Sequence, residues 1–436
     1  MVVAVSGTWN IETSLRKDVI LASNLSMAIQ RPLILPKESF NLVSQIIKFK
    51  VFFNLEKFRK WVVLAVALTA LLTGREGRAG ANDVVEFNRR ATATAQLLAG
   101  ITPNPPEPAF DRLTELDAWK EHQKWMTSQW AQVRSRLDTM ESWRDHELKI
   151  AGAHKKTLIY PFSGPDFLNP YTLFPNHARY VFFSLERPSA MPDMESVSTV
   201  QFAKLLTDVR SAFRDIFERN YFITSYMTKQ LTTPWIRGTV PVMATMMALM
   251  NRRIVRVEPI DLFPELTRAF DTPHSQRPRL LLRGVRIDFA NPQVPGTQQL
   301  YYYSLDATDK ALEHYPEFLS WVGQFKNSTA LIKSASYLLH DEQFYQTRSM
   351  LLENSDFIVQ DDTGIPYRFL SQSPWSVKLY GKYHKPIRPM EYAYQKDLEA
   401  AFIAKQGTAD LPFPFGYHWR GRKSGLILAS KGRSSN

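Results

Sequence analysis

The sequence predicts an α/β or α+β fold with a mixed sheet and flanking helices, preceded by a long N-terminal helix. From residue 156 onward, short apolar runs typical of buried strands alternate with segments of helical spacing. Some of these strands follow one another directly and others are separated by a helix, as in mixed sheets. Before them, apolar residues repeat at intervals of three and four from Leu116 to Met140, which indicates one long amphipathic helix.

Composition supports a large folded protein and excludes several kinds of chemistry. The chain has 436 residues, 44% apolar and 22% charged, enough for one large or two ordinary domains. It contains no cysteine, so thiol nucleophiles, disulfides, thiolate metal sites and lipoprotein anchors are excluded. Half of the net charge of +12 belongs to residues 1–81, and no basic run with interleaved aromatics follows. We therefore expect no nucleic-acid partner.

Residues 51–81 have the order of a secretory signal peptide. Basic residues precede the apolar run 61–73, and small residues follow it as far as Ala81. The run is 13 residues long, whereas a membrane-spanning helix needs about 20. Cleavage after Ala81 is therefore favoured; an uncleaved anchor, with membrane contact only through 61–73, and a buried core helix are the alternatives. Residues 1–50 lie upstream of such a signal, as an overextended gene start would explain.

Residues 82–150 are predicted to be helical with a proline-rich break. A short helix over 84–99 ends before the prolines of 102–108, which favour an extended segment. A long helix then covers 110–145, with Trp119 and Trp130 on its apolar side. We expect this side to pack on the chain's own domain. Coiled-coil pairing is the alternative, so the oligomeric state stays open.

Residues 151–430 are predicted to form the α/β domain, followed by a disordered tail at 431–436. Strands are expected at 157–162, 180–185, 254–257, 279–289, 300–305, 357–360, 367–370, 376–383 and 425–430. Helices are expected at 167–174, 200–217, 222–231, 241–251, 310–325, 329–340 and 342–353.

The first candidate site is the turn after the predicted strand 157–162. Ser163-Gly164-Pro165-Asp166 ends an apolar strand abruptly, and Pro165 suits the start of a helix. Ligands of α/β sheets bind where strands end at the carboxyl edge, so Ser163 and Asp166 are candidate catalytic residues. Alternatively, Ser163 caps the following helix and Asp166 complements its dipole.

The second candidate site is the segment 360–368. Asp361 and Asp362 are neighbouring carboxylates that are suited to acid–base catalysis, although Asp-Asp-Thr-Gly between two apolar runs is also typical of a hairpin turn. Four further residues are candidates for ligand binding: Lys333, Gln360, Arg368 and Tyr417. We expect the segment 360–364 to lie on the rim of the cleft beside Asp166.

Standard signatures of catalysis and cofactor binding do not occur. The sequence has no nucleophile elbow, no phosphate-binding glycine loop and no zinc-protease motif, and its nine histidines show no paired ligand spacing. We therefore predict neither a metal nor a cofactor.

Four segments resemble an uncharacterised family of exported bacterial proteins: YPFSGPDF at 160–167, KSASYL at 333–338, QDDTGIPY at 360–367 and LPFPFGY at 411–417. The resemblance covers roughly residues 155–430. It implies bacterial export and one continuous domain, and it brings no activity, ligand or catalytic residue.

The export signal and the missing signatures favour a protein of the bacterial periplasm or cell envelope. We expect it to bind a protein partner or an envelope polymer. The alternative is a hydrolase or transferase acting on envelope carbohydrate or ester bonds, with Ser163, Asp166, Asp361 and Asp362 in its cleft.

Overall fold

The structure is a computed structural model that describes residues 81–148, 156–261, 283–291, 293, 296–404, 409–420 and 424–432. The expected gene start, the export signal as far as Gly80, and residues 433–436 of the expected tail lie outside these ranges. Within them, no helix combines the length and apolar character needed to cross a membrane.

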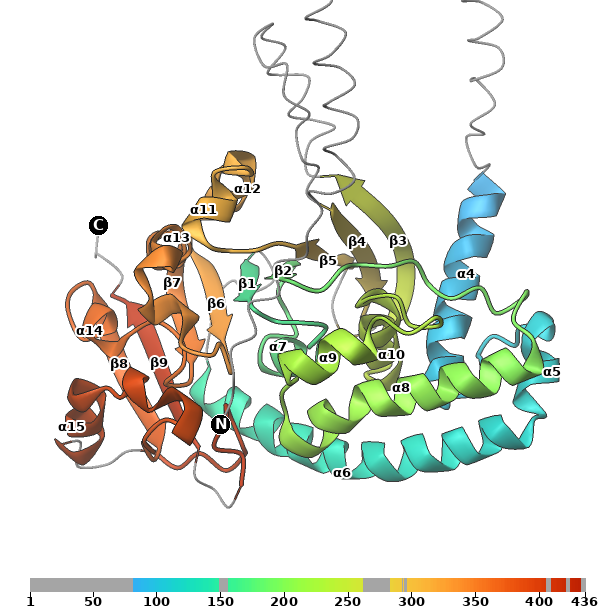
Figure 1. The fold of residues 1–436 in the computed structure, drawn as a ribbon, viewed down its shortest axis with the longest axis horizontal. Helices are drawn as coiled ribbons and strands as arrows, with labels where there is room; N and C mark the ends of the chain where they lie inside the picture. The colour runs from blue at the N-terminus through green and yellow to red at the C-terminus, as the bar shows by residue number, and fades with distance from the viewer. Residues whose placement is uncertain are drawn as a thin grey trace, which may run out of the picture. The chain divides into compact units, whose positions relative to one another are not determined.

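A nine-stranded mixed sheet forms the centre of the fold, in the order β3-β4-β5-β2-β1-β6-β7-β9-β8 (Figure 1). The α/β class and the mixed sheet are as predicted. Neighbours from β5 through β7 are parallel, whereas β3, β4 and β5 form an antiparallel meander. β9 is antiparallel to both of its neighbours. The strands are β1 (Thr157–Pro161), β2 (Arg179–Ser184), β3 (Arg253–Asp261), β4 (Arg283–Ala290), β5 (Thr297–Ser304), β6 (Ser328–Ile332), β7 (Ser355–Gln360), β8 (Trp375–Gly381) and β9 (Gly425–Lys431).

The chain changes direction across the sheet at β1. It passes from β1 to β2 on one side and later places β6 on the other side of β1. The connections therefore diverge between β1 and β6, and ligands of open α/β sheets bind at the carboxyl ends of such a strand pair. Every residue of β1 and of β6 is buried, as expected for parallel strands covered on both faces.

Helices cover both faces of the sheet. One hydrophobic core, which contains Tyr160 and Phe182, packs α4 to α10 on the first face. A second core, which contains Ile159 and Phe183, packs α11 to α15 on the other. The first group comprises α4 (Ala81–Leu98), α5 (Asp111–Thr114), α6 (Asp117–Glu147), α7 (Leu168–Leu173), α8 (Thr199–Arg219), α9 (Thr224–Gln230) and α10 (Val240–Leu249). The second comprises α11 (Asp309–Leu312), α12 (Pro316–Gly323), α13 (Tyr345–Asn354), α14 (Tyr367–Leu370) and α15 (Lys396–Ala404). Short 3-10 turns are η2 (Pro108–Phe110), η4 (Leu338–His340), η5 (Glu342–Phe344) and η6 (Arg388–Ala393).

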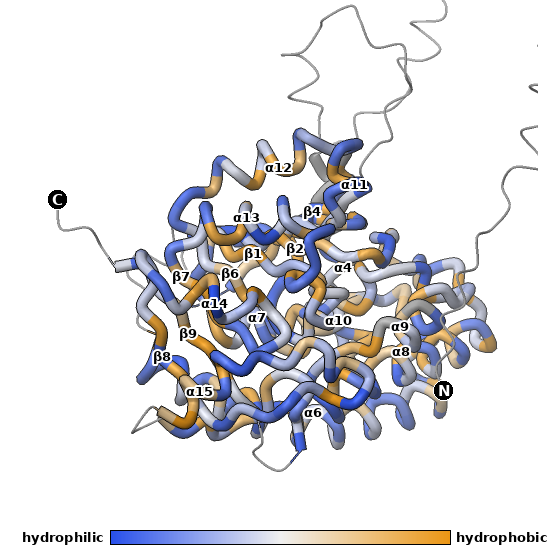
Figure 2. Tube along the Cα trace, turned by 60° about the vertical axis from the view of Figure 1, so that its left-hand side comes forward, coloured by the Kyte–Doolittle hydropathy of each residue, from blue (hydrophilic) through white to orange (hydrophobic). Residues whose placement is uncertain are grey.

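The long helix α6 lies beside α8 (Figure 1). It begins later than expected, because Leu116 has an extended backbone that separates it from α5. Hydrophilic and hydrophobic residues alternate along α6 (Figure 2), and its apolar side packs within the same core as α8. Trp119 is buried and Trp130 half-buried, with the Trp130 ring 6.4 Å from that of Phe217. The prediction that this side packs on the chain's own domain is confirmed.

Four local predictions are wrong. The helix expected at 329–340 is strand β6 followed by a loop and η4, because a short, fully buried apolar run has no period that separates strand from helix. The strand expected at 367–370 is α14, which starts directly after Pro366. The segment 360–364 is therefore not a hairpin turn, since β7 pairs with β6 and β9. Lys431 belongs to β9 rather than to a tail.

Candidate functional site

The carboxyl ends of β1, β6 and β7 bring four of the predicted residues together. Asp166 follows β1, Lys333 follows β6, and Asp361 and Asp362 follow β7. The Nζ atom of Lys333 lies 3.2 Å from Oδ2 of Asp166. The backbone N–H of Ser334, next to Lys333, donates to Oδ2 of Asp361 at 3.0 Å. The order of the parallel strands thus makes one cluster of residues that are far apart in sequence.

Asp166 is held on all sides by the protein. Its carboxylate is 2% exposed and accepts from the Tyr160 hydroxyl at 3.0 Å. The backbone N–H of Asn169, in the first turn of α7, donates to Oδ1 at 3.1 Å, and the Asn169 amide donates to Oδ2 at 2.9 Å. Asp166 therefore stabilises the start of α7, as the structural alternative proposed. Ser163 does not cap α7, because its hydroxyl donates to the Gly164 carbonyl.

Lys333 occupies the position where α8 ends. Besides Asp166, it binds the carbonyl oxygen of Asn220, the residue that ends α8 in a left-handed conformation. Arg136 from α6 donates to the carbonyls of Ile216 and Phe217 at 3.2 and 3.0 Å. The buried Lys333 and the half-buried Arg136 thus both face the negative end of the α8 dipole. Burial lowers the pKa of Lys333, although Asp166 acts in the opposite direction.

Asp361 is buried and Asp362 half-buried, and the two carboxylates differ in their partners. Asp361 accepts from the Thr363 backbone N–H at 3.0 Å and from the Thr363 hydroxyl at 2.5 Å, in addition to Ser334. Asp362 accepts from the Tyr337 hydroxyl at 2.5 Å. Burial raises the pKa of both carboxyl groups. Burial and the neighbouring Asp361 raise the pKa of Asp362 to about 7, so it binds a proton near neutral pH.

Two of the predicted ligand-binding residues hold loops in place. Gln360 donates to the Ile365 carbonyl at 2.7 Å and accepts from the Ile365 N–H at 2.9 Å, which closes the turn after β7. The Tyr417 hydroxyl donates to the carbonyl of Ser334 at 2.9 Å. These contacts give Gln360 and Tyr417 a structural role.

The cavity inside this cluster is small. Its volume is about 70 Å³, and its lining includes Ser163, Asp166 and Lys333. Such a volume suits water molecules and is too small for an organic ligand. Within the described part of the chain, no side chain hydrogen-bonds to the Ser163 hydroxyl. The arrangement therefore provides no base that could activate this serine.

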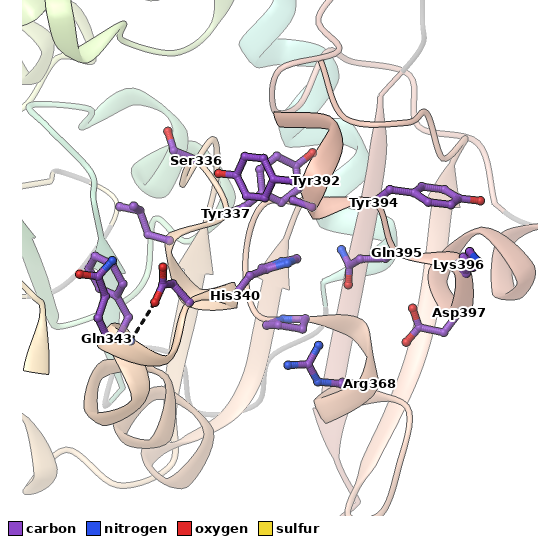
Figure 3. A pocket seen from close by; sticks show the side chains of 15 residues that line it. Ser336, Tyr337, His340, Gln343, Arg368, Tyr392, Tyr394, Gln395, Lys396 and Asp397 are labelled. Carbon is purple, nitrogen blue, oxygen red and sulfur yellow. Dashed lines mark hydrogen bonds between the residues drawn. The ribbon is translucent and has the colours of Figure 1, made fainter. Parts of the chain in front are cut away.

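A larger cavity, which we call the tyrosine groove, adjoins the cluster. Its volume is about 720 Å³, and it shares Ser336 and Leu338 with the small cavity. Figure 3 shows Tyr337 and Tyr392 on one side, Arg368 on the opposite side, and His340 and Gln395 between them. Of the predicted candidates, only Arg368 lines this groove. The sequence analysis missed Tyr392, although two tyrosines and a glutamine at 392–395 are an unusual group for an exposed segment.

His340 is the unusual titratable group of the tyrosine groove. Burial, followed by the charges of Arg368 and Arg348, lowers its pKa to about 4. The imidazole is therefore neutral at pH 7. Its Nε2 atom is buried and has no hydrogen-bond partner among the described residues. A neutral, unpaired ring nitrogen can accept a hydrogen bond from a hydroxyl group or donate one to an oxygen atom.

Within the described ranges, no cluster of three or more His, Asp or Glu side chains has an arrangement that could hold a metal ion. The polar groups of the cluster are instead used for pairing with one another. Comparison with protein-family models, with curated proteins and with solved structures finds no match to this chain.

Proposed function

We propose that the chain is an exported protein of the bacterial envelope that binds an envelope polysaccharide in the tyrosine groove. The groove itself is the observation that carries this proposal. Its volume of about 720 Å³ is within the range of ligand-binding pockets. Tyrosine rings present an apolar face, which packs on the C–H face of a sugar ring, and a polar hydroxyl. A polysaccharide that extends beyond the ends of the groove would pack its sugar rings on the tyrosine rings and hydrogen-bond to the tyrosine hydroxyls.

The residues of the groove divide into a rigid floor and groups that can reach a ligand. Gln395 belongs to the floor, because its amide accepts from the Tyr367 N–H at 2.7 Å and donates to the Asp362 carbonyl at 2.9 Å. Tyr392, 79% exposed, and the exposed Arg368 can reach a ligand. They supply the ring face and the hydrogen-bond donors that a sugar ring and its hydroxyl groups require.

The second candidate function is a hydrolase or transferase acting on envelope carbohydrate or ester bonds. It is favoured by the neighbouring carboxyl groups of Asp361 and Asp362 at the end of β7, because paired carboxyl groups serve acid–base catalysis and burial raises the pKa of Asp362. The other candidates support it less. Asp166 is paired with Lys333, and the Ser163 hydroxyl donates to the Gly164 carbonyl and not to a basic side chain of the described residues. Binding without turnover therefore accounts for more of the geometry.

Alanine substitutions in the groove test the proposed binding. We expect Tyr392→Ala and Arg368→Ala each to weaken the binding of soluble envelope glycan fragments about tenfold, which corresponds to about 1.4 kcal/mol. Titration calorimetry measures the affinities. Tyr226→Ala provides a matched control. Tyr226 is 52% exposed on α9 and does not line the groove. Binding that is unchanged in both groove variants would contradict the proposal, and glycan cleavage by the wild-type chain would favour the enzyme.

The N-terminus of the protein recovered from its native host tests the proposed export. We expect the mature chain to begin at Asn82, because the small residues at 79–81 form the cleavage motif. Edman sequencing of the cell-envelope fraction identifies this residue. Ala81→Phe should block cleavage and leave an unprocessed chain. Recovery of a chain that starts at Met1 in the cytoplasm would contradict export, and an intact chain in the membrane fraction would indicate the anchor.

A further inference from the structure

The parallel part of the sheet has the strand order of nucleotide-binding sheets. Numbered along the chain, its five parallel strands follow the order third, second, first, fourth and fifth, that is β5-β2-β1-β6-β7. Doubly wound sheets of this order often carry a glycine in the turn after the first strand and an acidic residue after the second, which binds ribose hydroxyls. Here Gly164 follows β1, and Glu186 follows β2, 22 residues further along.

Glu186 lies in a cavity that is separate from the tyrosine groove. This cavity has a volume of about 740 Å³. The Ser184 hydroxyl donates to Oε2 of Glu186 at 2.6 Å, and the Tyr302 hydroxyl donates to the Glu186 carbonyl at 2.7 Å. These two contacts, from the end of β2 and from β5, fix the position of the carboxylate at the carboxyl edge of the sheet.

The rest of this cavity combines apolar and cationic groups. Leu185, 64% exposed, and Pro234 supply apolar surface, and Arg187 and Arg237 are exposed cations. Arg237 uses Nε to donate to the Pro234 carbonyl at 3.2 Å, and its terminal nitrogens make no hydrogen bond with the described residues. The carboxylate suits the hydroxyl pair of a sugar, and the apolar wall suits a flat base. The two guanidinium groups suit a phosphate.

We propose that this cavity binds a ribonucleotide. Glu186 accepts the hydrogen bonds of the ribose 2′- and 3′-hydroxyls, the base packs on Leu185 and Pro234, and Arg187 and Arg237 pair with the phosphate. The phosphate does not occupy the turn after β1, as it would in a dinucleotide-binding sheet. There a side-chain Cβ on Gly164 would lie only 2.9 Å from Sδ of Met227, so the turn is already covered by α9. The proposal does not depend on the tyrosine groove.

Calorimetric titration of the full chain with adenosine 5′-monophosphate tests this site. We expect saturable binding to the wild type, and Glu186→Gln should weaken it at least tenfold. Glu186→Gln should also abolish the preference for the ribonucleotide over its 2′-deoxy form, which a merely structural role would not do. Arg237→Ala should weaken binding of the monophosphate and leave the affinity for adenosine unchanged. Circular dichroism verifies that each variant is folded.

Exposed residues elsewhere provide the matched controls. Glu121→Gln on α6 and Arg214→Ala on α8 remove the same charges away from this cavity and should leave the affinity unchanged. No binding to the wild type at millimolar nucleotide, or an equal affinity of Glu186→Gln, would overturn the proposal. Ribose 5-phosphate that binds as tightly as the nucleotide would overturn it as well, because the apolar wall would then not recognise a base.

Discussion

Replacing Lys333 with methionine is expected to lower the free energy of unfolding by about 3–5 kcal/mol, the usual cost of breaking a buried ion pair from one side. Methionine keeps much of the apolar stem and removes the charge. The carboxylate of Asp166, 3.2 Å away, is then left without its cation in a region that is only 2% exposed. The carbonyl of Asn220 at the end of α8 also loses its donor, which adds to the cost. Urea denaturation measures the change.

A second substitution separates the ion pair from general packing. In the double variant Lys333→Met with Asp166→Asn, no unpaired charge remains, and the Asn side chain keeps the shape of Asp. We expect the double variant to be more stable than Lys333→Met alone, and the thermodynamic cycle to give a clear coupling energy. A loss below about 1 kcal/mol for Lys333→Met, the range of surface ion pairs, would show that Lys333 is not a buried partner of Asp166.

Gly416→Ala is expected to destabilise the fold by about 3 kcal/mol or more, because backbone strain and a steric clash add together. Gly416 has a φ of +72°, and a Cβ there would lie 2.1 Å from Oδ2 of Asp361. The carboxylate cannot withdraw easily, since Ser334 and Thr363 hold both of its oxygens. Thermal and urea unfolding at neutral pH measure the loss.

Gly296 provides the matched control for this substitution. Its φ of +83° is similarly left-handed, and a Cβ at Gly296 meets no atom within 4 Å. Gly296→Ala should therefore show the backbone cost alone, about 1 kcal/mol. Equal losses in the two variants would mean that the contact between Gly416 and Asp361 contributes nothing to the effect.

The sequence predicts those elements whose residues have a distinctive period or end at a clear turn. The strand at 157–162 is bounded by a Gly-Pro turn, and the amphipathic stripe of α6 has a period that only a helix produces. β6 could not be identified in this way, because its five residues are all buried and show no alternation. The pairing of β7 with β9 joins segments that are distant in sequence, so no turn pattern at 360–364 could reveal it.

The residues of the candidate site can be predicted one by one from sequence, but their proximity cannot. Asp166 and Asp361 were identified from the turns in which they occur, but their proximity depends on the order of β1, β6 and β7. Lys333 was placed on a helix, and only the assignment of β6 puts it at the end of a strand. The ion pair with Asp166 then follows from topology. Glu186 was not identified, although an acidic residue directly after a second strand was present as a pattern.

The position of β9 between β7 and β8 has a consequence for the order in which the sheet assembles. β8 has no hydrogen-bonded neighbour in the sheet other than β9 within the described residues, and β9 follows it in the sequence. β7 therefore lacks its second strand neighbour until residues 425–431 have paired, whereas β8 also contacts α6, since the Tyr380 hydroxyl donates to Glu147 at 2.6 Å. Exposed edges of this kind recruit foreign strands. A folding intermediate without β9 is thus the state in which the open edge of β7 is most prone to pair with another chain.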